Sequence, residues 1–311
     1  PLAGLSTPAT GQAWPAKPVR LVVPFVPGGS TDLLARRIGE KLAVALEQPV
    51  LVDNRGGAGG VTGTDSVAKS PPDGYMLLFG VTGTQAISAS LNPRLPYDPV
   101  RDFAAITLVV SAPLVIVVNA ASPIRDVADL VAQARANPAK LTHGSPGNGT
   151  SMHLTGEMFA QASATRLVHV PYRGSAPAVQ DLLGGQTQLL IDAGSVLLPQ
   201  IKGGKLKALA VTGPKRDPQL PDVPTVRELG LGAMESVGFQ GLVGPAGLPR
   251  DVVDRIAAEL ARVLAQAEVK AKFAGVGAEV HSLGPTEFAT FVKAENEKWA
   301  KLIRERKLQL D

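Results

Sequence analysis

The sequence predicts an α/β protein with two similar lobes, each built on a doubly wound, mostly parallel sheet. Apolar strand-like runs alternate with helical patterns in the first half of the chain, and the same alternation returns after residue 140. Each half also carries a glycine-rich loop between a strand and a helix. Alternating strands and helices favour parallel sheets with right-handed crossovers. With 311 residues and 45% hydrophobic composition, the chain is long enough for two such lobes.

The first half alternates strands with helices. Its opening strand is a near-continuous apolar run, as a strand buried on both faces requires. Leucines and isoleucine then recur at helical spacing. The predicted elements are strand 19–26, helix 33–46, strand 50–52, a helix that ends at Val67, and strand 75–79. The apolar stretch 103–118 is too short to span a membrane, and Pro113 within it predicts two strands that meet around residues 111–113.

The second half repeats this order and ends in helices. The predicted elements are strand 140–143, helix 151–161, strand 166–170, helix 176–183, strand 187–191 and strand 239–243. Asp251 is expected to cap an amphipathic helix that runs through Ala267, and the last helix covers 285–306. These helices must pack on a lobe, because isolated helices are marginal in water.

The two glycine-rich loops are candidate anion-binding sites. Glycine permits tight turns, and the N-terminus of a helix offers unpaired N–H groups and the positive end of its dipole. The first loop supplies Pro27, Gly28, Gly29, Ser30, Thr31 and Asp32, and the second supplies Ser145, Gly147, Asn148, Gly149 and Thr150, with His153 in the first turn of the following helix. Further candidates at or near strand ends are Thr82, Thr84, Tyr172, Arg173 and Asp192. Two such loops that face each other across a cleft would bind a carboxylate.

Other site chemistries fit the sequence less well. Neither glycine loop contains the Gly-Lys-Ser/Thr of a phosphate-binding loop, and the dinucleotide fingerprint fails at Met152 and Thr62. The four histidines lack the spacing of a metal site, and the chain has no cysteine. The net charge of +4 is not gathered into a block and lacks interleaved aromatics, which argues against nucleic-acid binding. We therefore expect no cofactor and no metal.

A serine hydrolase is the alternative hypothesis. The segment 143–147 differs from Gly-x-Ser-x-Gly only in its first residue, and Asp192 and His281 follow Ser145 in the hydrolase order. Pro146 argues against it, because the residue after the nucleophile should donate its backbone N–H to the oxyanion and proline has none.

Several motifs in order along the chain resemble the Bug receptors of tripartite tricarboxylate transporters. The matching segments are 24–32, 52–55 with the glycines that follow, 72–75, 144–149, 170–174, 181–186 and 221–225, within a similarity from about Trp14 to the C-terminus. Departures are modest and fall at Val26-Pro27 and at Pro146.

The resemblance implies a periplasmic solute-binding protein with a two-lobed, type II Venus-flytrap fold and no catalytic activity. Family members bind dicarboxylates, acidic amino acids or aromatic acids and deliver them to membrane permease subunits. Lobe one would comprise 14–118 and 239–311, and lobe two 119–238, with crossings near 117–122 and 237–243. We expect a monomer. Residues 1–13, which are small, polar and rich in proline, serine and threonine, are expected to be a disordered remnant of a processed N-terminus.

Overall fold

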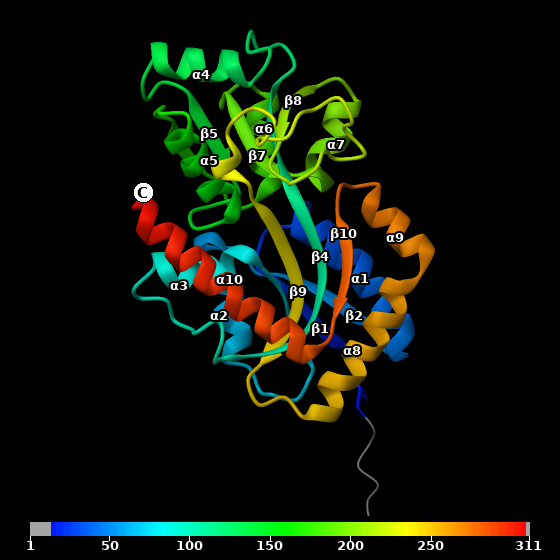
Figure 1. Cartoon of the computed structure of the whole chain (residues 1–311). Coiled ribbons are helices and arrows are strands. Elements are labelled where there is room, and N and C mark those ends of the chain that lie inside the picture. Colours follow the sequence, from blue (N-terminus) through cyan, green and yellow to red (C-terminus); the bar gives the residue numbers. More distant parts are fainter. Residues whose placement is uncertain (1–13, 309–311) are drawn as a thin grey trace, which may run out of the picture.

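The computed structural model describes residues 14–308 and shows an elongated molecule with two lobes, joined by long strands (Figure 1). The predicted disordered remnant, 1–13, lies outside the described residues. Within them, the strands follow the order β2-β1-β3-β9-β4-β7-β5-β6, and both β8 and β10 pair with β4. The strands are β1 (Val19–Val23), β2 (Val50–Asn54), β3 (Met76–Val81), β4 (Phe103–Asn119), β5 (Thr142–Ser145), β6 (Val168–Pro171), β7 (Leu189–Ala193), β8 (Leu206–Val211), β9 (Val237–Pro245) and β10 (Glu279–Leu283).

The helices follow the alternation that the sequence predicts. They are α1 (Ser30–Leu46), α2 (Val61–Ala68), α3 (Ser88–Leu91), α4 (Val127–Ala136), α5 (Ser151–Ala162), α6 (Ser175–Leu183), α7 (Gly194–Lys202), α8 (Arg250–Ala265), α9 (Ala267–Ala274) and α10 (Pro285–Arg306), with short helical segments η1 (Ala58–Gly60), η2 (Gly83–Ile87, a π-helix) and η3 (Gly232–Met234). The first lobe is defined here by β2, β1, β3, β9, β10 and the first part of β4. The second lobe comprises β7, β5, β6, β8 and the last part of β4.

Each lobe has a parallel centre, as expected. In the first lobe β1 pairs in parallel with both β2 and β3, and in the second β5 pairs in parallel with both β6 and β7. The carboxyl ends of these strands lead into the helices that begin at the cleft between the lobes. The two-lobed α/β architecture that the sequence predicts is thereby confirmed.

The prediction of two strands in 103–118 is wrong, because β4 runs unbroken from Phe103 to Asn119. Its partner changes from β9 to β7 and β8 between Pro113 and Leu114, a few residues before the expected crossing at 117–122. Pro113 lies opposite Val237 at this change of partners. A proline is tolerated in a strand where its missing N–H costs no ladder bond. The residue boundaries of the two lobes stay a prediction.

The sequence pattern of α1 explains its place in the first lobe. Leu34, Ile38, Leu42 and Leu46 recur at helical spacing, and all are buried against the sheet. The helix ends at Leu46, and its C-cap Glu47 adopts a left-handed conformation and donates its N–H back to the last turn. Burial of such a stripe against β1 and β3 fixes the N-terminus of α1 at the carboxyl end of β1.

The C-terminal helices cover the first lobe. Helix α8 packs against α1 and β4, whereas α10 packs against η2, α3 and β4 (Figure 1). The prediction that Asp251 caps α8 is wrong, because Pro249 occupies the N-cap position. Asp251 lies in the first turn instead, where its negative charge interacts favourably with the helix dipole. A break at Gln266 separates α8 from α9. No helix in residues 14–308 is long and apolar enough to cross a membrane.

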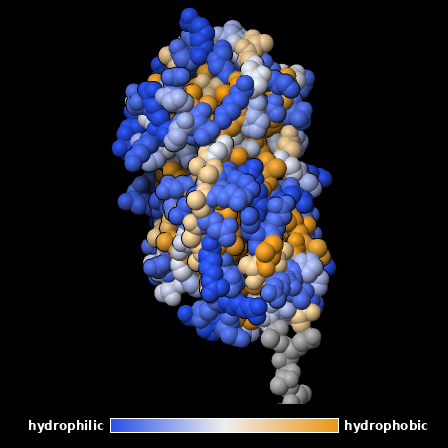
Figure 2. All heavy atoms as spheres, turned by 90° about the vertical axis from the view of Figure 1, so that its right-hand side faces the viewer, coloured by the Kyte–Doolittle hydropathy of each residue, from blue (hydrophilic) through white to orange (hydrophobic). Residues whose placement is uncertain are grey.

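The face at the right of Figure 1 is largely hydrophilic, and its hydrophobic patches are small and scattered (Figure 2). The apolar side chains are instead gathered inside. One hydrophobic cluster fills the space between α1, α8 and the first sheet, a second lies under α6 and α7, and a third contains residues of both lobes, such as Leu78 and Leu154. The lobes are thus joined by packed side chains as well as by strands.

Candidate functional site

Five helical N-termini meet at the cleft between the lobes. Helix α1 and η2 begin there from the first lobe, and α5, α6 and α7 begin there from the second. One cavity is lined by residues from the start of α1, the end of β3 with Thr82, the start of α5 and the end of β7; a smaller one adds Gly29, Ser30 and Ser175. Because the first N–H groups of a helix lack partners within it, this arrangement can bind an anion.

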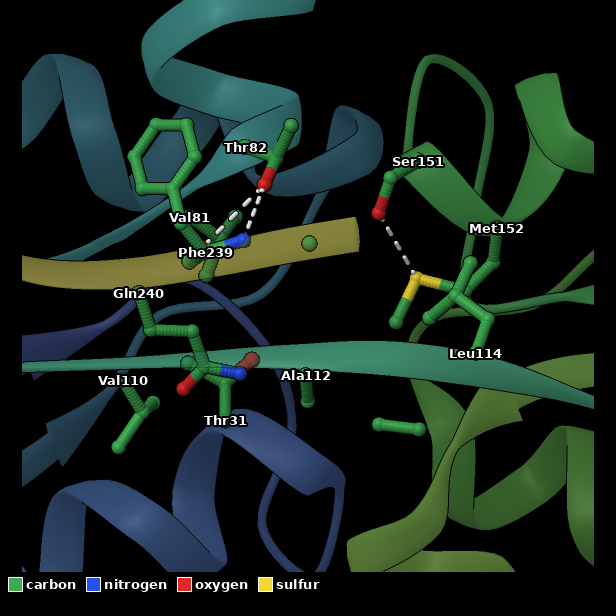
Figure 3. Close-up of a pocket in the computed structure, with 12 residues that line it drawn as sticks. Thr31, Val81, Thr82, Val110, Ala112, Leu114, Ser151, Met152, Phe239 and Gln240 are labelled. Atoms are coloured by element: carbon green, nitrogen blue, oxygen red, sulfur yellow. Dashed lines mark hydrogen bonds between the residues drawn. The ribbon is translucent and has the colours of Figure 1, made fainter. Parts of the chain in front are cut away.

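The larger cavity has apolar walls and few polar side chains (Figure 3). Its lining residues are Thr31, Val81, Thr82, Val110, Ala112, Leu114, Ser151, Met152, Ala193, Gly238, Phe239 and Gln240. None of the described residues that line either cavity carries a charged side chain. An anion here would be held by N–H groups and hydroxyls, without a cationic side chain that would be costly to bury unpaired.

The first glycine loop is braced from within its own lobe by Asp32. Its carboxylate accepts bonds from Gly28 N at 2.9 Å, from Arg36 Nε at 3.0 Å and from Asn54 Nδ2 at 2.9 Å. Burial opposes the charged form, but the bonds from Arg36, Gly28 and Asn54 outweigh it and lower the pKa of Asp32. Gly28 has φ +82, which only glycine adopts readily. Asp32 therefore shapes the loop, while Ser30 and Thr31 line the cavities.

The second loop is braced by hydroxyls and histidines behind it. Ser145 Oγ accepts from Gly147 N at 3.1 Å and lies 2.6 Å from His169 Nε2. Thr150 caps α5 by accepting from His153 N at 3.2 Å, and His153 Nδ1 accepts from Gly149 N at 3.2 Å. The rings of His153 and His169 stack at 3.9 Å. These side chains hold the loop rather than line the cavity.

A third histidine, which is buried, completes this cluster. His143 stacks obliquely on His169 at 5.6 Å, and burial together with His169 and His153 lowers its pKa well below the usual range. Its ring lies against Gly156 of α5, where a Cβ would overlap it. Glycine at 156 thus allows α5 to approach β5 closely.

The two lobes touch through backbone and small side chains at the cleft. Ser30 Oγ lies 3.5 Å from Ser175 Oγ across the lobes. A Cβ on Gly59, in η1 of the first lobe, would overlap the carbonyl oxygen of Asn148 in the second glycine loop. Gly59 has φ +63. Closure of the lobes therefore depends on the absence of a side chain at this point.

Several other predicted residues occupy positions apart from the cavities. Tyr172 donates its hydroxyl to Asp181 Oδ2 at 2.7 Å, and Arg173 is exposed. Thr84 bonds to the backbone of Val81, and Thr82, which does line the cavity, accepts from Phe239 N at 2.7 Å. The predicted residues that line a cavity are Gly29, Ser30, Thr31 and Thr82; Pro27, Gly28, Asn148 and Gly149 lie in the loops beside them.

Asp192 is the penultimate residue of β7 and precedes Ala193, which lines the larger cavity. Its side chain is fully buried, and its Oδ1 accepts from Ala193 N at 2.7 Å. Burial raises the pKa of Asp192 to about 7, although the hydroxyl of Ser175 and the N–H of Ala193 oppose the rise. A contact between Asp192 and ligand stays a prediction.

Sequence reasoning missed most of the side chains that form the walls. Ser151, Met152, Ser175, Phe239 and Gln240 line the cavities but were not among the predicted residues. Of these residues, only Gln240 stands out in the sequence, because it is a polar residue inside the apolar run 239–243. Which face of β9 it occupies depends on the register with β3 and β4, which a single sequence does not give.

The hydrolase alternative is wrong in its arrangement. His281 Nε2 bonds to Ser111 Oγ at 2.7 Å, in the first lobe, so it is not a partner of Ser145. The histidine beside Ser145 is His169, and Asp192 bonds instead to the backbone of Ala193. Ser145 is completely buried and turned into its own loop. Its hydroxyl bonds within the second lobe, to Gly147 and His169, and a contact between Ser145 and ligand stays a prediction.

Replacement of Ser145 by alanine should therefore act on the fold. The change leaves Gly147 N and His169 Nε2 without the hydroxyl, so we expect the free energy of unfolding to fall by roughly 1–3 kcal/mol. Urea denaturation measures the loss. Ser66→Ala is the matched control, since the Ser66 hydroxyl bonds to a carbonyl one turn earlier in its own helix. Esterase activity in the parent protein that disappears in Ser145→Ala would contradict the structural role.

Comparison with known proteins identifies the family. The profile described as the tripartite tricarboxylate transporter family receptor matches residues 34–308. The chain belongs to this family of receptors. It is 35% identical to the protein BugT of Bordetella pertussis over 97% of this chain and 93% of that protein.

Two solved structures of Rhodopseudomonas palustris proteins are also similar to this receptor. One is MatC with bound malate, with a TM-score of 0.90 and 31% identity over 93% of this chain and 100% of that chain. The other is a protein with adipate, with a TM-score of 0.92 and 33% identity over 95% of this chain and 99% of that chain. The chain is thus a Bug-type solute-binding receptor, not an enzyme.

Proposed function

We propose that this receptor is periplasmic, captures a small carboxylate between its lobes as a monomer, and delivers it to a tripartite-type permease. The observation that carries the proposal is the meeting of helical N-termini from both lobes around a cavity whose described lining carries no charged side chain. Relatives that hold malate and adipate support the same ligand class. Dicarboxylates, acidic amino acids and aromatic acids are the candidates.

The carboxylate would be held at both walls of the cleft. On the first lobe the N–H groups and hydroxyls of 28–31 are available, and on the second the N-terminus of α5 with Ser151. Contacts from both lobes favour the closed form, by no more than the difference in affinity between the closed and open forms. Release to a permease then requires the lobes to separate.

Mass spectrometry of ligand released from the denatured protein, followed by a thermal-shift screen of organic acids, tests this function. A carboxylate at a hundredfold excess over its dissociation constant should stabilise the fold by roughly 2.7 kcal/mol. Esters and nucleotides serve as controls. Stabilisation by these controls alone would reject the carboxylate receptor.

The hydroxyl of Thr31 should contribute to binding directly. Thr31 lies in the first turn of α1 and lines both cavities. Thr31→Val keeps the shape but removes the hydroxyl, so we expect the affinity for the best carboxylate of the screen to fall about tenfold. Thr290→Val on α10 is the control, because its hydroxyl bonds within its own helix. Calorimetry that gives equal affinities for the parent and Thr31→Val would place the hydroxyl outside the ligand's reach.

A further inference from the structure

Gln240 is one of the residues that line the larger cavity. It lies on β9, where its neighbours across the sheet are Val81 on β3 and Val110 on β4. Residues directly opposite on adjacent strands share a face of the sheet. All three line the larger cavity, so a single amide stands between two valines (Figure 3).

The amide of Gln240 has an unmet hydrogen-bonding requirement. Its Oε1 atom is buried, and no described residue gives it a hydrogen bond. A buried polar atom without a partner destabilises a fold, whereas a valine or leucine would suit this apolar row. The fold alone therefore does not explain a glutamine here. Because Gln240 lines the cavity, a group that enters the cavity can supply this partner.

Three kinds of ligand group could meet this amide, and they differ in how well they satisfy it. A second carboxylate would accept from the Gln240 NH₂ but would leave Oε1 buried beside a negative charge. An ammonium group would donate to Oε1 but would be buried without a counter-ion, because no carboxylate lines the cavity among the described residues. A hydroxyl both donates and accepts, so it can pair reciprocally with the amide.

We propose that Gln240 is a specificity-determining residue that pairs with a hydroxyl group of the bound carboxylate, so that small hydroxycarboxylates are the preferred ligands. The inference rests on the proposed function, since the carboxylate itself is held at the helical N-termini. The valines beside Gln240 accommodate the carbon chain. A deoxy analogue would bind by the same carboxylate contacts and leave the amide unpaired.

Matched pairs of acids test this inference on the parent protein without any substitution. The probes are malate against succinate, lactate against propionate, and 3-hydroxybutyrate against butyrate, measured by calorimetry at one pH. We expect at least one hydroxy acid to bind about tenfold or more tightly than its deoxy partner, because sites built to bond a hydroxyl reject the analogue without it. Aspartate carries an ammonium group where malate carries the hydroxyl, so it tests the ammonium alternative. We expect aspartate to bind more weakly than malate.

Gln240→Met assigns the preference to this residue. Methionine keeps the length of the side chain and removes the amide, so the preference for the hydroxy acid should fall to within about twofold while the affinity for the deoxy acid is kept or improved. Gln266→Met, at an exposed position between α8 and α9, is the matched control and should keep the parent's preference. Gln240→Asn gives a second reading should the methionine variant fold poorly, and its shorter amide should also lose the preference.

Each result decides the inference. Equal binding of hydroxy and deoxy acids by the parent would overturn it while leaving the carboxylate receptor intact. A preference that persists in Gln240→Met and Gln240→Asn would assign it to another residue and overturn the role of Gln240. Binding of none of the acids would reject the proposed function and this inference together.

Discussion

Gly59→Ala should abolish tight ligand binding by holding the lobes apart. The new Cβ would overlap the carbonyl oxygen of Asn148, a backbone atom of the opposite lobe that cannot rotate away. In addition, φ +63 is strained for alanine. The apparent affinity falls in proportion to the population of the closed form, so a loss of at least about tenfold in affinity is expected for the best carboxylate of the screen.

Small-angle scattering and calorimetry together measure this effect. The parent should become more compact when ligand is added, and Gly59→Ala should not. Gly204→Ala is the matched control, because Gly204 has a similar φ of +67 and a Cβ added there would meet no neighbouring atom within 4 Å. Gly204→Ala therefore distinguishes the effect of backbone strain from the effect of obstructing the cleft. Normal affinity and compaction in Gly59→Ala would show that the lobes bind ligand without this close approach.

Asp192→Asn should change how the stability of the receptor depends on pH. Burial raises the pKa of Asp192 to about 7, above its value of about 4 in an unfolded chain. The folded state therefore binds more protons between these values, and the free energy of unfolding of the parent falls as pH rises through this window. The fall is at most about 1.4 kcal/mol for each pH unit. Above pH 7 Asp192 is ionised in both the folded and the unfolded state, so its contribution to the free energy of unfolding no longer changes with pH.

Asparagine has nearly the same shape and cannot ionise, so this part of the pH dependence should disappear. Urea denaturation at pH 4.5, 6 and 8 should show the variant gaining on the parent as pH rises. Asp222→Asn, at an exposed position, should keep the parent's profile. A difference between parent and Asp192→Asn that does not vary with pH would mean that Asp192 stays ionised throughout.

The sequence predicts the fold well where one periodicity dominates. The spacing of Leu34, Ile38 and Leu42 is typical of a helix and gives α1, and the apolar run at 19–23 gives a buried strand. Pro113 misled because proline usually ends a strand, but here it lies where β4 exchanges partners. That exchange depends on contacts with strands far along the chain, which local patterns do not report.

The residues of the candidate site also fall into those that the sequence predicts and those that it does not. The loop glycines and Thr31 follow from local chemistry, because a strand, a turn and a helix place them together. The bracing roles of Ser145 and His153 depend on His169 and on the path of the loop, which only the folded chain reveals. Gln240 is visible in the sequence as a polar residue in an apolar run, but its place at the cavity depends on strand pairing.

The position of β9 also governs the order in which the molecule can be assembled during synthesis. β9 lies between β3 and β4, yet it begins at Val237, more than a hundred residues after β4 ends at Asn119. Until it has left the ribosome, the facing edges of β3 and β4 have no partner. Unpaired strand edges are sites of misassociation in incomplete chains. The first lobe, although it starts the chain, is therefore the last to be completed, and the second lobe can form while the first still waits for its central strand.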